Sequence, residues 1–575
     1  MTLPGDGPTG PIAGDDGATG FSDVDDWLLR DGATREFVGS AASAVASLVR
    51  STLGPRGCET LVETVDSHDD PEVVLTADAG EILDALERAS GFAHPVAALL
   101  IDAVDSHRRA LGDGTTTALL LSGALVEAGL DLVDEGLHPM SVIVGYGLAN
   151  ARAGETLDDL AREVDPGSAA DLRDVAATAM ADARDEAWRA ESASAVAEVV
   201  AGLARATDRG WVATDDVGVV GSTAVETGVV DGVVVRREPA TYHEMPEFTT
   251  RSFGQRPAIP EPVEDATVVV VDDEIDFEET ASTFERGTGG RVALGSREAA
   301  QEYATQLDAR RAGAARRLRD LGVDVLVVQE RVEDPVQRAF ERADVAVIDR
   351  AKYPYEDADR LADATGAQVA SFVDDISADH LGTAGRVRDR LVDGEKWATF
   401  EGCGDGVSTV VVGARTRSAL DWRERLVEDA LDVTAVAASD RQVLPGAGAH
   451  AAAVAGDVRE YARSVGRREQ LAVEAFADAL ETVPRTLAAN AGHDPATVVA
   501  ALRAARRGDG PAAPGVDPAG PEPLDAWAAG VVEPRRVFSQ AVETAVGVTE
   551  QLLALDTVLF PEVDLDSFDP MVEHE

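Results

Sequence analysis

The chain has 575 residues, 45% of them apolar and only 5% aromatic, so it can form several buried cores built mainly from Ala, Val and Leu. Its net charge is −54, which argues against a nucleic-acid-binding face and excludes nucleic acid as an expected partner. The two cysteines and nine scattered histidines give neither a disulfide framework nor the spacing of a metal site. The sequence also shows no signal-peptide pattern and no apolar run of membrane-spanning length, so we expect a cytoplasmic protein with no membrane partner.

The acidic excess has three possible explanations: a nucleic-acid binder, a disordered acidic chain, or a folded protein of a high-salt cytoplasm. The first lacks a basic face, and the second would lack the hydrophobic periodicity that this chain has. In molar salt, screening limits the repulsion between surface charges to a distance of about 3 Å, so a folded protein with this acidic excess is stable in such a solution. We therefore expect adaptation to a high-salt cytoplasm, a setting that leaves the activity open.

The first third of the chain is predicted to be mostly helical. Residues 1–30 are rich in Gly and Asp and are expected to be a disordered acidic tail. Residues 36–50 place apolar side chains on one helical face, and the loop TLGPRG (52–57) ends that helix. The stretches CETLVET and PEVVLTAD (58–78) predict a β-hairpin. Three further helices are predicted at 82–90, 95–106 and 115–132.

The middle of the chain has a different pattern. Residues 150–210 are mostly helical, and short β-branched runs begin at about residue 211. Strands then alternate with helices as far as about residue 372, which predicts an α/β unit with a partly parallel sheet. After Ser418 the chain is again mostly helical to about residue 557. This order predicts a discontinuous helical domain with an insertion, although periodicity does not tell whether the two ends meet.

The stretch GDGTTT (112–117) stands before the predicted helix at 115–132. A helix N-terminus with flanking glycines and hydroxyls is suited to bind phosphate, and Asp113 is explained if Mg²⁺ lies between it and the phosphates. The alternative is a simple helix cap after a flexible loop. A second and a third glycine loop, TLGPRG and LPGAGAH (444–450), are weak signals individually. Asp429, on a predicted helix, would by default be a solvated surface residue.

Taken together and in this order, these stretches resemble the group II chaperonin family, the archaeal thermosomes and their eukaryotic cytosolic relatives. The resemblance extends from about Asp31 to Pro561, and GDGTTT matches the most diagnostic motif of the family without change. The other matching stretches are TLGPRG, GLHPMSVIVGYGLA (136–149), VEDAL (427–431), LPGAGAH, NAGHDP (490–495) and DAWAAGVVEPRRV (525–537).

The resemblance implies a multi-domain chaperonin fold with three domains. A mainly α, discontinuous equatorial domain would bind ATP, an α+β intermediate domain would act as a hinge, and an α/β apical domain would carry a helical lid protrusion. The implied ranges are equatorial 31–149 and 435–575, intermediate 150–229 and 368–434, and apical 230–367, with the protrusion at about 277–302.

The resemblance also implies an ATP-dependent chaperone subunit of a double ring, with eight or nine subunits per ring, that encloses non-native polypeptides. Its cofactors would be ATP and Mg²⁺. Asp113 would hold Mg²⁺, Asp429 would polarise the attacking water, and Asp78 would be a third catalytic carboxylate. The implied nucleotide-binding residues are Thr52, Leu53, Gly54, Pro55, Gly112, Gly114, Thr115, Thr116, Thr117, Gly446, Ala447, Gly448, Asp525 and Glu533.

The sequence departs from the family pattern around the nucleotide. TADAG (76–80) replaces the usual Thr-Asn-Asp-Gly, GAG (446–448) replaces a triple glycine, and Ala451 stands where an acidic residue is usual. The chain has lysine only at Lys352 and Lys396, so Arg56 and Arg184 are candidates to replace pocket lysines.

These departures leave an alternative function open: a divergent ring or scaffold subunit with weak or no ATPase that co-assembles with typical subunits. The presence of both Asp113 and Asp429 favours the active chaperone. A generic phosphotransferase lacks support, because no acid/base constellation for a second substrate is visible.

Overall fold

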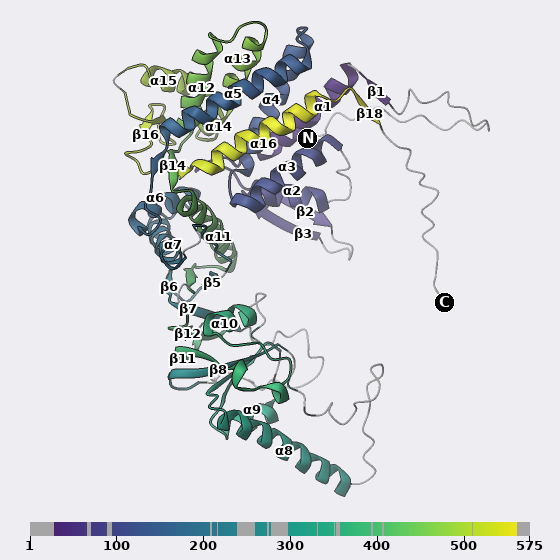
Figure 1. Ribbon diagram of the computed structural model, residues 1–575, viewed down its shortest axis with the longest axis vertical. Coiled ribbons are helices and arrows are strands. Elements are labelled where there is room, and N and C mark those ends of the chain that lie inside the picture. The colour runs from purple at the N-terminus through teal and green to yellow at the C-terminus, as the bar shows by residue number, and fades with distance from the viewer. Residues whose placement is uncertain are drawn as a thin grey trace, which may run out of the picture.

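The computed structural model describes residues 28–559. Within that range it leaves out 31, 66–70, 89–94, 208–209, 216, 238–258, 273–274, 276, 278–296, 331, 350, 352–356, 393–394, 405–406 and 509. Most of the expected tail (1–27) and of the expected protrusion (278–296) therefore lies outside the described residues. The described part of the chain forms an elongated molecule with a helical body at one end, a smaller middle body and a distal α/β body (Figure 1).

The helical body combines elements from both ends of the chain. Its N-terminal elements are β1 (Leu28–Arg30), α1 (Gly32–Arg50), β2 (Thr60–Val65), β3 (Pro71–Thr76), α2 (Ala79–Arg88), α3 (Pro95–Leu111), α4 (Thr115–Asp134) and α5 (Pro139–Leu160). Its C-terminal elements are α12 (Ala449–Ala462), α13 (Glu469–Leu480), α14 (Thr482–Asn490), α15 (Pro495–Ala505), β15 (Pro514–Gly515), β16 (Leu524–Asp525), α16 (Arg535–Leu553) and β18 (Thr557–Leu559). The predicted helices and the antiparallel β2–β3 hairpin are thus confirmed.

One apolar core joins the two halves of this body. It contains buried side chains of α1, α3, α4, α5, α12, α13 and α16, and β1 pairs with β18 at its edge. Helix α4 is long and apolar enough to cross a membrane by length and composition, but it packs between α1 and α16 in this core. Core helices of globular domains meet the same criterion, so α4 gives no support for a membrane span.

The middle body is a helical layer beside a small sheet. It contains α6 (Ala169–Ala179), α7 (Glu186–Ala206) and α11 (Arg417–Asp440), with β5 (Gly218–Ser222), β6 (Gly228–Val230) and β13 (Thr409–Gly413). A separate three-stranded sheet, β4 (Arg162–Glu163), β14 (Gln442–Pro445) and β17 (Val532–Pro534), lies where this body meets the helical body. Helix α11 packs against both α6 and α7 through buried residues such as Val427 and Leu431.

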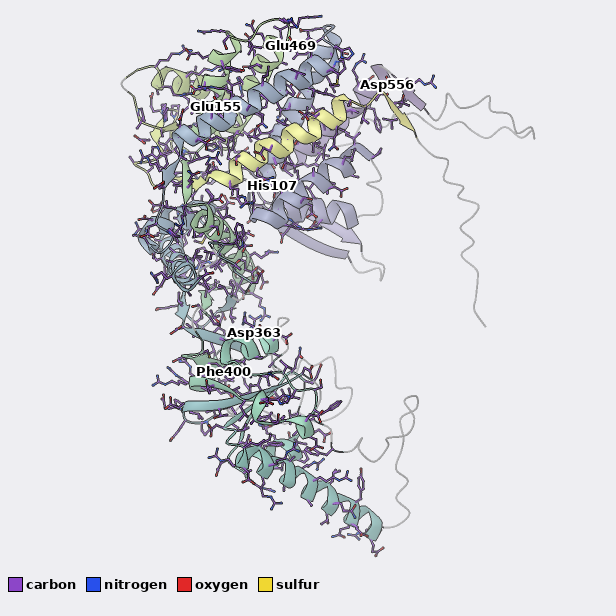
Figure 2. All side chains as sticks on the ribbon, in the orientation of Figure 1. His107, Glu155, Asp363, Phe400, Glu469 and Asp556 are labelled. Atoms are coloured by element: carbon purple, nitrogen blue, oxygen red, sulfur yellow. The ribbon has the colours of Figure 1, made fainter. Side chains whose placement is uncertain are left out.

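The distal body is built on a six-stranded sheet of order β10-β9-β8-β11-β12-β7. Its elements are β7 (Gly232–Arg237), β8 (Val263–Val271), α8 (Arg297–Asp320), β9 (Val325–Val328), α9 (Asp334–Glu341), β10 (Ala346–Ile348), α10 (Asp357–Thr365), 3₁₀ turns at Val373–Asp375 and Ala378–His380, β11 (Gly382–Val392) and β12 (Glu395–Glu401). Figure 2 labels Asp363 and Phe400 in this body, and Glu155 and Glu469 in the helical body.

The apolar strands of the distal sheet are buried on both faces. Val269 and Val271 of β8 face a core under α8 and α9, whereas Val268 and Val270 face a core with α10. Because both faces are covered there, residues 268–271 of β8 and the whole of β9 are continuous apolar runs. The pairs β8–β9 and β9–β10 are parallel and the other three pairs are antiparallel, so the expected partly parallel sheet is confirmed.

Strands β11 and β12 belong to the sheet of the distal body, a placement that the sequence analysis did not predict. Their residues fall in the range 368–434, which was expected in the hinge, but they pair with β8 and β7 in the distal sheet. The partners of these strands, β8 and β7, lie far away in the sequence, so no local pattern places β11 and β12 in the distal sheet. The predicted strand at 367–372 reduces to one bridge between Val271 and Ala370.

Candidate functional site

The loop before α4 leaves the first amides of that helix without a side-chain cap. Gly114 is the N-cap residue at φ 86°, and within the described part of the chain this helix start has no side-chain cap. Thr115 is buried, and Thr116 and Thr117 are half-buried. A simple helix cap would need a side chain that accepts hydrogen bonds from these amides. Without one, the start of α4 is better suited to bind an anion.

The two glycines of this loop are required by conformation and by space. Gly112 and Gly114 have φ values of 70° and 86°, which favour glycine. A Cβ atom at Gly112 would lie 2.7 Å from Cβ of Asp432, and one at Gly114 would lie 2.6 Å from Nε2 of His107. Asp113 Oδ1 accepts a hydrogen bond from the Gly114 amide at 2.5 Å, so the carboxylate is held beside the helix start.

Five carboxylates from different parts of the chain influence one another here: Asp78, Asp113, Asp182, Asp429 and Glu533, which we call the acidic group. Asp113 keeps exposed surface although protein atoms surround it densely, and this desolvation, with Glu533 and Asp78, raises its pKa to about 6. Asp429 likewise keeps exposed surface, but the density of protein atoms around it, with Asp78 and Asp113, raises its pKa well above its usual range. The structure therefore brings together the three predicted catalytic carboxylates.

Each of the three carboxylates comes from a different element. Asp78 precedes α2, and its Oδ1 accepts a hydrogen bond from the Glu81 amide at 2.8 Å. Asp113 belongs to the loop before α4, and Asp429 lies on α11 of the middle body. An ion pair of 3.1 Å between Arg425 Nη1 and Glu81 Oε1 joins α11 to α2, one helical turn from Asp429. Asp429 thus reaches the site from a separate body of the molecule.

Sequence reasoning missed two charged residues near the site. Asp182, after α6, has its pKa raised to about 6 by desolvation, Asp113 and Glu59. Arg108, on the last turn of α3, acts on Asp78 electrostatically and forms an ion pair of 2.9 Å with Asp84. The only available signal for Arg108 was a basic residue one turn before GDGTTT. The expected substitutes for lysine, Arg56 and Arg184, are both exposed.

The loop at 52–55 and the turn at 446–448 meet on one helix, α14. Gly54 has φ 83°, and a Cβ atom there would lie 2.3 Å from Cδ2 of Leu487. A Cβ atom at Gly448 would lie 3.2 Å from Cδ1 of the same leucine. Asn490 Nδ2 donates hydrogen bonds to the carbonyl oxygens of Arg50 (3.0 Å) and Leu53 (2.8 Å). The nearby Thr52 is buried, Leu53 is half-buried and Pro55 is exposed.

Two predicted nucleotide-binding residues have protein partners. Asp525 accepts hydrogen bonds from the amides of Ala512 (3.0 Å) and Trp527 (3.1 Å), so its carboxylate holds the β15–β16 region together. Glu533 lies 2.8 Å from Nδ1 of the buried His450. Burial opposes the charged form of His450, but Glu533 outweighs it and the pKa of His450 is raised. Of the two, the structure places Glu533 in the acidic group.

Ala447 occupies a backbone conformation that favours glycine. Its φ is 54°, and Gly446 and Gly448 flank it at the start of α12. A left-handed conformation costs a non-glycine residue about 1–2 kcal/mol, part of which glycine loses again through chain entropy. We expect Ala447→Gly to raise the free energy of unfolding by about 0.5–1 kcal/mol in thermal or denaturant unfolding. A loss of stability of that size would show that the Ala447 methyl group packs favourably enough to offset the strain.

Comparison with known proteins decides the family. A sequence model of the TCP-1/cpn60 chaperonin family matches residues 45–562 of this chain. The chain is 35% identical to thermosome subunit 1 of Haloferax volcanii and 34% identical to thermosome subunit alpha of Halobacterium salinarum, in each case over 90% of this chain and 87% of the relative. It is 32% identical to a thermosome subunit of a Desulfurococcus species over 90% of both chains.

The chain belongs to the TCP-1/cpn60 chaperonin family.

Its thermosome relatives place it in group II, and it is a chaperonin subunit that acts in protein folding. Chaperonins of this family are nucleotide-dependent oligomers that act on client polypeptides. The resemblance deduced from GDGTTT and the accompanying motifs is confirmed.

The residues of this chaperonin fit a nucleotide with a divalent cation. The uncapped start of α4 offers amides and hydroxyls to phosphate, and the raised pKa values of Asp113 and Asp429 indicate carboxylates that need a positive partner. Among the described residues no three His, Cys, Asp or Glu side chains are grouped as a metal cage. Mg²⁺ is typically bound by one or two carboxylates and by phosphate oxygens, so such a cage is not required.

Proposed function

We propose that this chaperonin subunit hydrolyses ATP at the acidic group, and that hydrolysis drives the enclosure and release of non-native polypeptides. The observation that carries the proposal is that Asp429, on α11 of the middle body, lies close enough to Asp78 and Asp113 of the helical body for their charges to raise its pKa, while the Arg425–Glu81 ion pair joins α11 to α2. A catalytic carboxylate on a separate body couples hydrolysis to the relative movement of the two bodies. The presence of all three carboxylates favours this function over a scaffold subunit without ATPase.

Each group has a role that follows from its place. The amides and hydroxyls of Thr115–Thr117 would bind phosphate oxygens at the positive end of α4. Asp113, with Asp78 beside it, would hold Mg²⁺, which neutralises the phosphate charge when bound. Asp429 would orient the attacking water and accept its proton. The glycines at 54 and 446–448 let the backbone of two further loops approach the nucleotide closely.

The three bodies suggest an assignment of domains. We propose that the helical body, from residues 28–160 and about 446–559, is the equatorial domain. The distal body would be the apical domain from residue 230 to about 404, because β11 and β12 complete its sheet. The hinge would then consist of about 161–229 and about 405–445, because α5 continues to Leu160 and α11 to Asp440. The protrusion at 277–302 stays a prediction.

Two small sheets support assembly into rings. The pairs β1–β18 and β2–β3 are each two-stranded sheets in the described part of the chain. Such strand edges favour pairing with another chain, so we propose that they join neighbouring subunits of the same ring. Eight- or nine-membered rings, stacked in pairs, are both compatible with this contact.

The proposed activity is tested by Mg²⁺-dependent ATP hydrolysis of the purified protein in about 2–3 M KCl, where surface charge is screened. We expect turnover that stops when EDTA removes Mg²⁺. Absence of turnover, with intact rings seen by electron microscopy, would contradict the proposal and favour the scaffold subunit.

The net charge of −54 predicts a salt requirement, in keeping with a high-salt cytoplasm. At low ionic strength the acidic surface repels itself, whereas about 1 M salt limits that repulsion to about 3 Å. We expect the far-UV circular dichroism of the helices to decrease below a few hundred millimolar KCl. A spectrum unchanged in salt-free buffer would contradict this adaptation.

A further inference from the structure

One short helix, α14, packs against two of the proposed nucleotide loops, 52–55 and 446–448. Leu487 of α14 fills the space beside both Gly54 and Gly448, and Pro484 lies 3.2 Å from a Cβ atom placed at Gly448. Asn490, at the other end of α14, holds the main chain of the 50–53 segment through two carbonyl oxygens. A shift of α14 therefore moves both loops at once.

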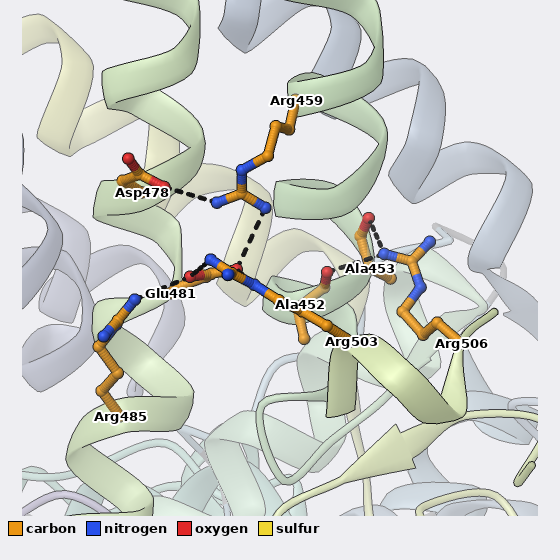
Figure 3. A network of polar contacts seen from close by, with 8 residues as sticks. All are labelled: Ala452, Ala453, Arg459, Asp478, Glu481, Arg485, Arg503 and Arg506. Atoms are coloured by element: carbon orange, nitrogen blue, oxygen red, sulfur yellow. Dashed lines mark hydrogen bonds and ion pairs between the residues drawn. The ribbon is translucent and has the colours of Figure 1, made fainter. Parts of the chain in front are cut away.

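The start of α14 is fixed by a buried carboxylate. Glu481, the N-cap residue of α14, is only 2% exposed. Arg503 of α15 binds it through two nitrogens, with Nε 2.7 Å from Oε1. Arg485 Nη2 lies 3.0 Å from Oε2, and Arg459 Nη1 lies 3.2 Å from Oε1. Figure 3 shows the three guanidinium groups converging on Glu481, and Arg459 also forms an ion pair with Asp478.

This cluster connects the elements that form the site. Arg459 is on α12, the helix that begins at the Gly448 turn, Arg485 is on α14, and Arg503 is on α15. Desolvation opposes the Glu481 carboxylate, but its arginine partners outweigh it and its pKa is lowered, so it stays charged. Salt screens buried ion pairs much less than exposed ones. Because the Glu481 carboxylate is buried, salt should screen its ion pairs less than pairs in which both partners are exposed.

We propose that Glu481 is a positioning residue for the nucleotide site: it fixes α14, and through Leu487 and Asn490 it sets the positions of the loops at 52–55 and 446–448. The proposal rests on the proposed ATP site. Glu481 makes no contact with the acidic group, so it would act on nucleotide binding more than on the chemical step. It would explain why three partly exposed arginines converge on one buried carboxylate in a chain of such strong negative charge.

The test uses the full-length protein with Glu481→Gln, which keeps the side-chain volume and removes the charge that three arginines share. We expect KM for ATP to rise about tenfold with kcat within about threefold, because displaced loops weaken binding while the acidic group is untouched. The matched control is Asp478→Asn on the same cluster, whose carboxylate is 66% exposed and contacts Arg459 alone in the described structure. We expect that control to change KM less than about twofold.

Hydrogen–deuterium exchange without nucleotide provides a second readout that does not depend on ATPase. Glu481→Gln should speed amide exchange at 50–58 and 446–451 while leaving α4 and α16 unchanged. An unchanged KM, or faster exchange spread over the whole helical body, would overturn the proposal. If Glu481→Gln fails to fold, Asn490→Ala decides: it removes only the link to Arg50 and Leu53, and it should raise KM and speed exchange at 50–58.

The two readouts separate this proposal from the proposed function. A wild-type protein that neither binds nor hydrolyses ATP would refute the ATP site, and local exchange in Glu481→Gln would still decide whether Glu481 positions the loops. A wild-type protein that hydrolyses ATP, with Glu481→Gln behaving like wild type in both readouts, would refute the positioning role alone.

Discussion

Replacing Asp429 by alanine should lower the rate of ATP hydrolysis by about 10²–10⁴-fold, the usual contribution of a positioned general base. ATP binding should persist, because the proposed phosphate contacts come from the start of α4 and from the loops at 52–55 and 446–448. Removal of one carboxylate from a group of mutually repelling acids should not weaken that binding. Single-turnover hydrolysis and equilibrium binding of a fluorescent ATP analogue, both in high salt, measure the two effects separately.

The matched control is Asp421→Ala on the same helix. Asp421 is an exposed aspartate two turns before Asp429, and it has no part in the acidic group. Its replacement should leave hydrolysis within about twofold of the wild type, as expected for a solvated surface charge. Equal loss in both variants would show that α11 contributes by its integrity and not through the Asp429 carboxylate.

Replacing Asp113 by asparagine should abolish Mg²⁺-dependent hydrolysis and at the same time stabilise the nucleotide-free protein. Loss of the cation contact removes several kcal/mol of charge stabilisation, so the rate should fall by at least about a hundredfold. Stability should rise because Asp113 is a carboxylate held beside Asp78 and Glu533 in a desolvated place. Activity and stability therefore oppose each other at this position.

The sign of the stability effect follows from the pKa. The pKa of Asp113 is raised to about 6 in the folded protein, above its unfolded value of about 3.9. The folded state thus binds the proton more tightly, and the ionised form destabilises the fold above pH 6. The increase in melting temperature of Asp113→Asn over wild type should be full at pH 7.5 and should disappear as the pH falls towards 4.

Thermal unfolding at these two pH values, at constant salt and without nucleotide, measures the difference. Asp102→Asn, which replaces an exposed aspartate on α3 outside the acidic group, serves as the control. A variant that is less stable than wild type at pH 7.5 would contradict the repulsion that we infer at Asp113.

The sequence predicted the parts of the site that depend on local pattern. Glycines at 112 and 114 are required by positive φ and by the close approach of Asp432 and His107, and that requirement leaves a visible motif. The apolar strands of the distal sheet were also predictable, because burial on both faces requires runs of consecutive apolar residues, and such runs are visible in the sequence. The resemblance to a family supplied Asp429, because nothing on α11 itself distinguishes it from a surface residue.

Other features depend on contacts between distant segments and left no local signal. Arg108 matters because Asp78 lies beside it, and Asp182 because Asp113 does; neither proximity is visible in the sequence. In the sequence Glu481 is indistinguishable from an ordinary helical glutamate. Only the structure shows the three arginines from α12, α14 and α15 around it. The pairing of β11 and β12 with the distal sheet was missed for the same reason.

The measurement that tests the central claim most directly is a structure of the assembled protein with Mg²⁺ and a non-hydrolysable ATP analogue. We predict triphosphate density at the start of α4, between the loops at 52–55 and 446–448, with the cation against Asp113 and the Asp429 carboxylate facing the terminal phosphate. Nucleotide bound elsewhere, or rings that stay empty at millimolar analogue, would contradict the assignment of the acidic group as the site of hydrolysis.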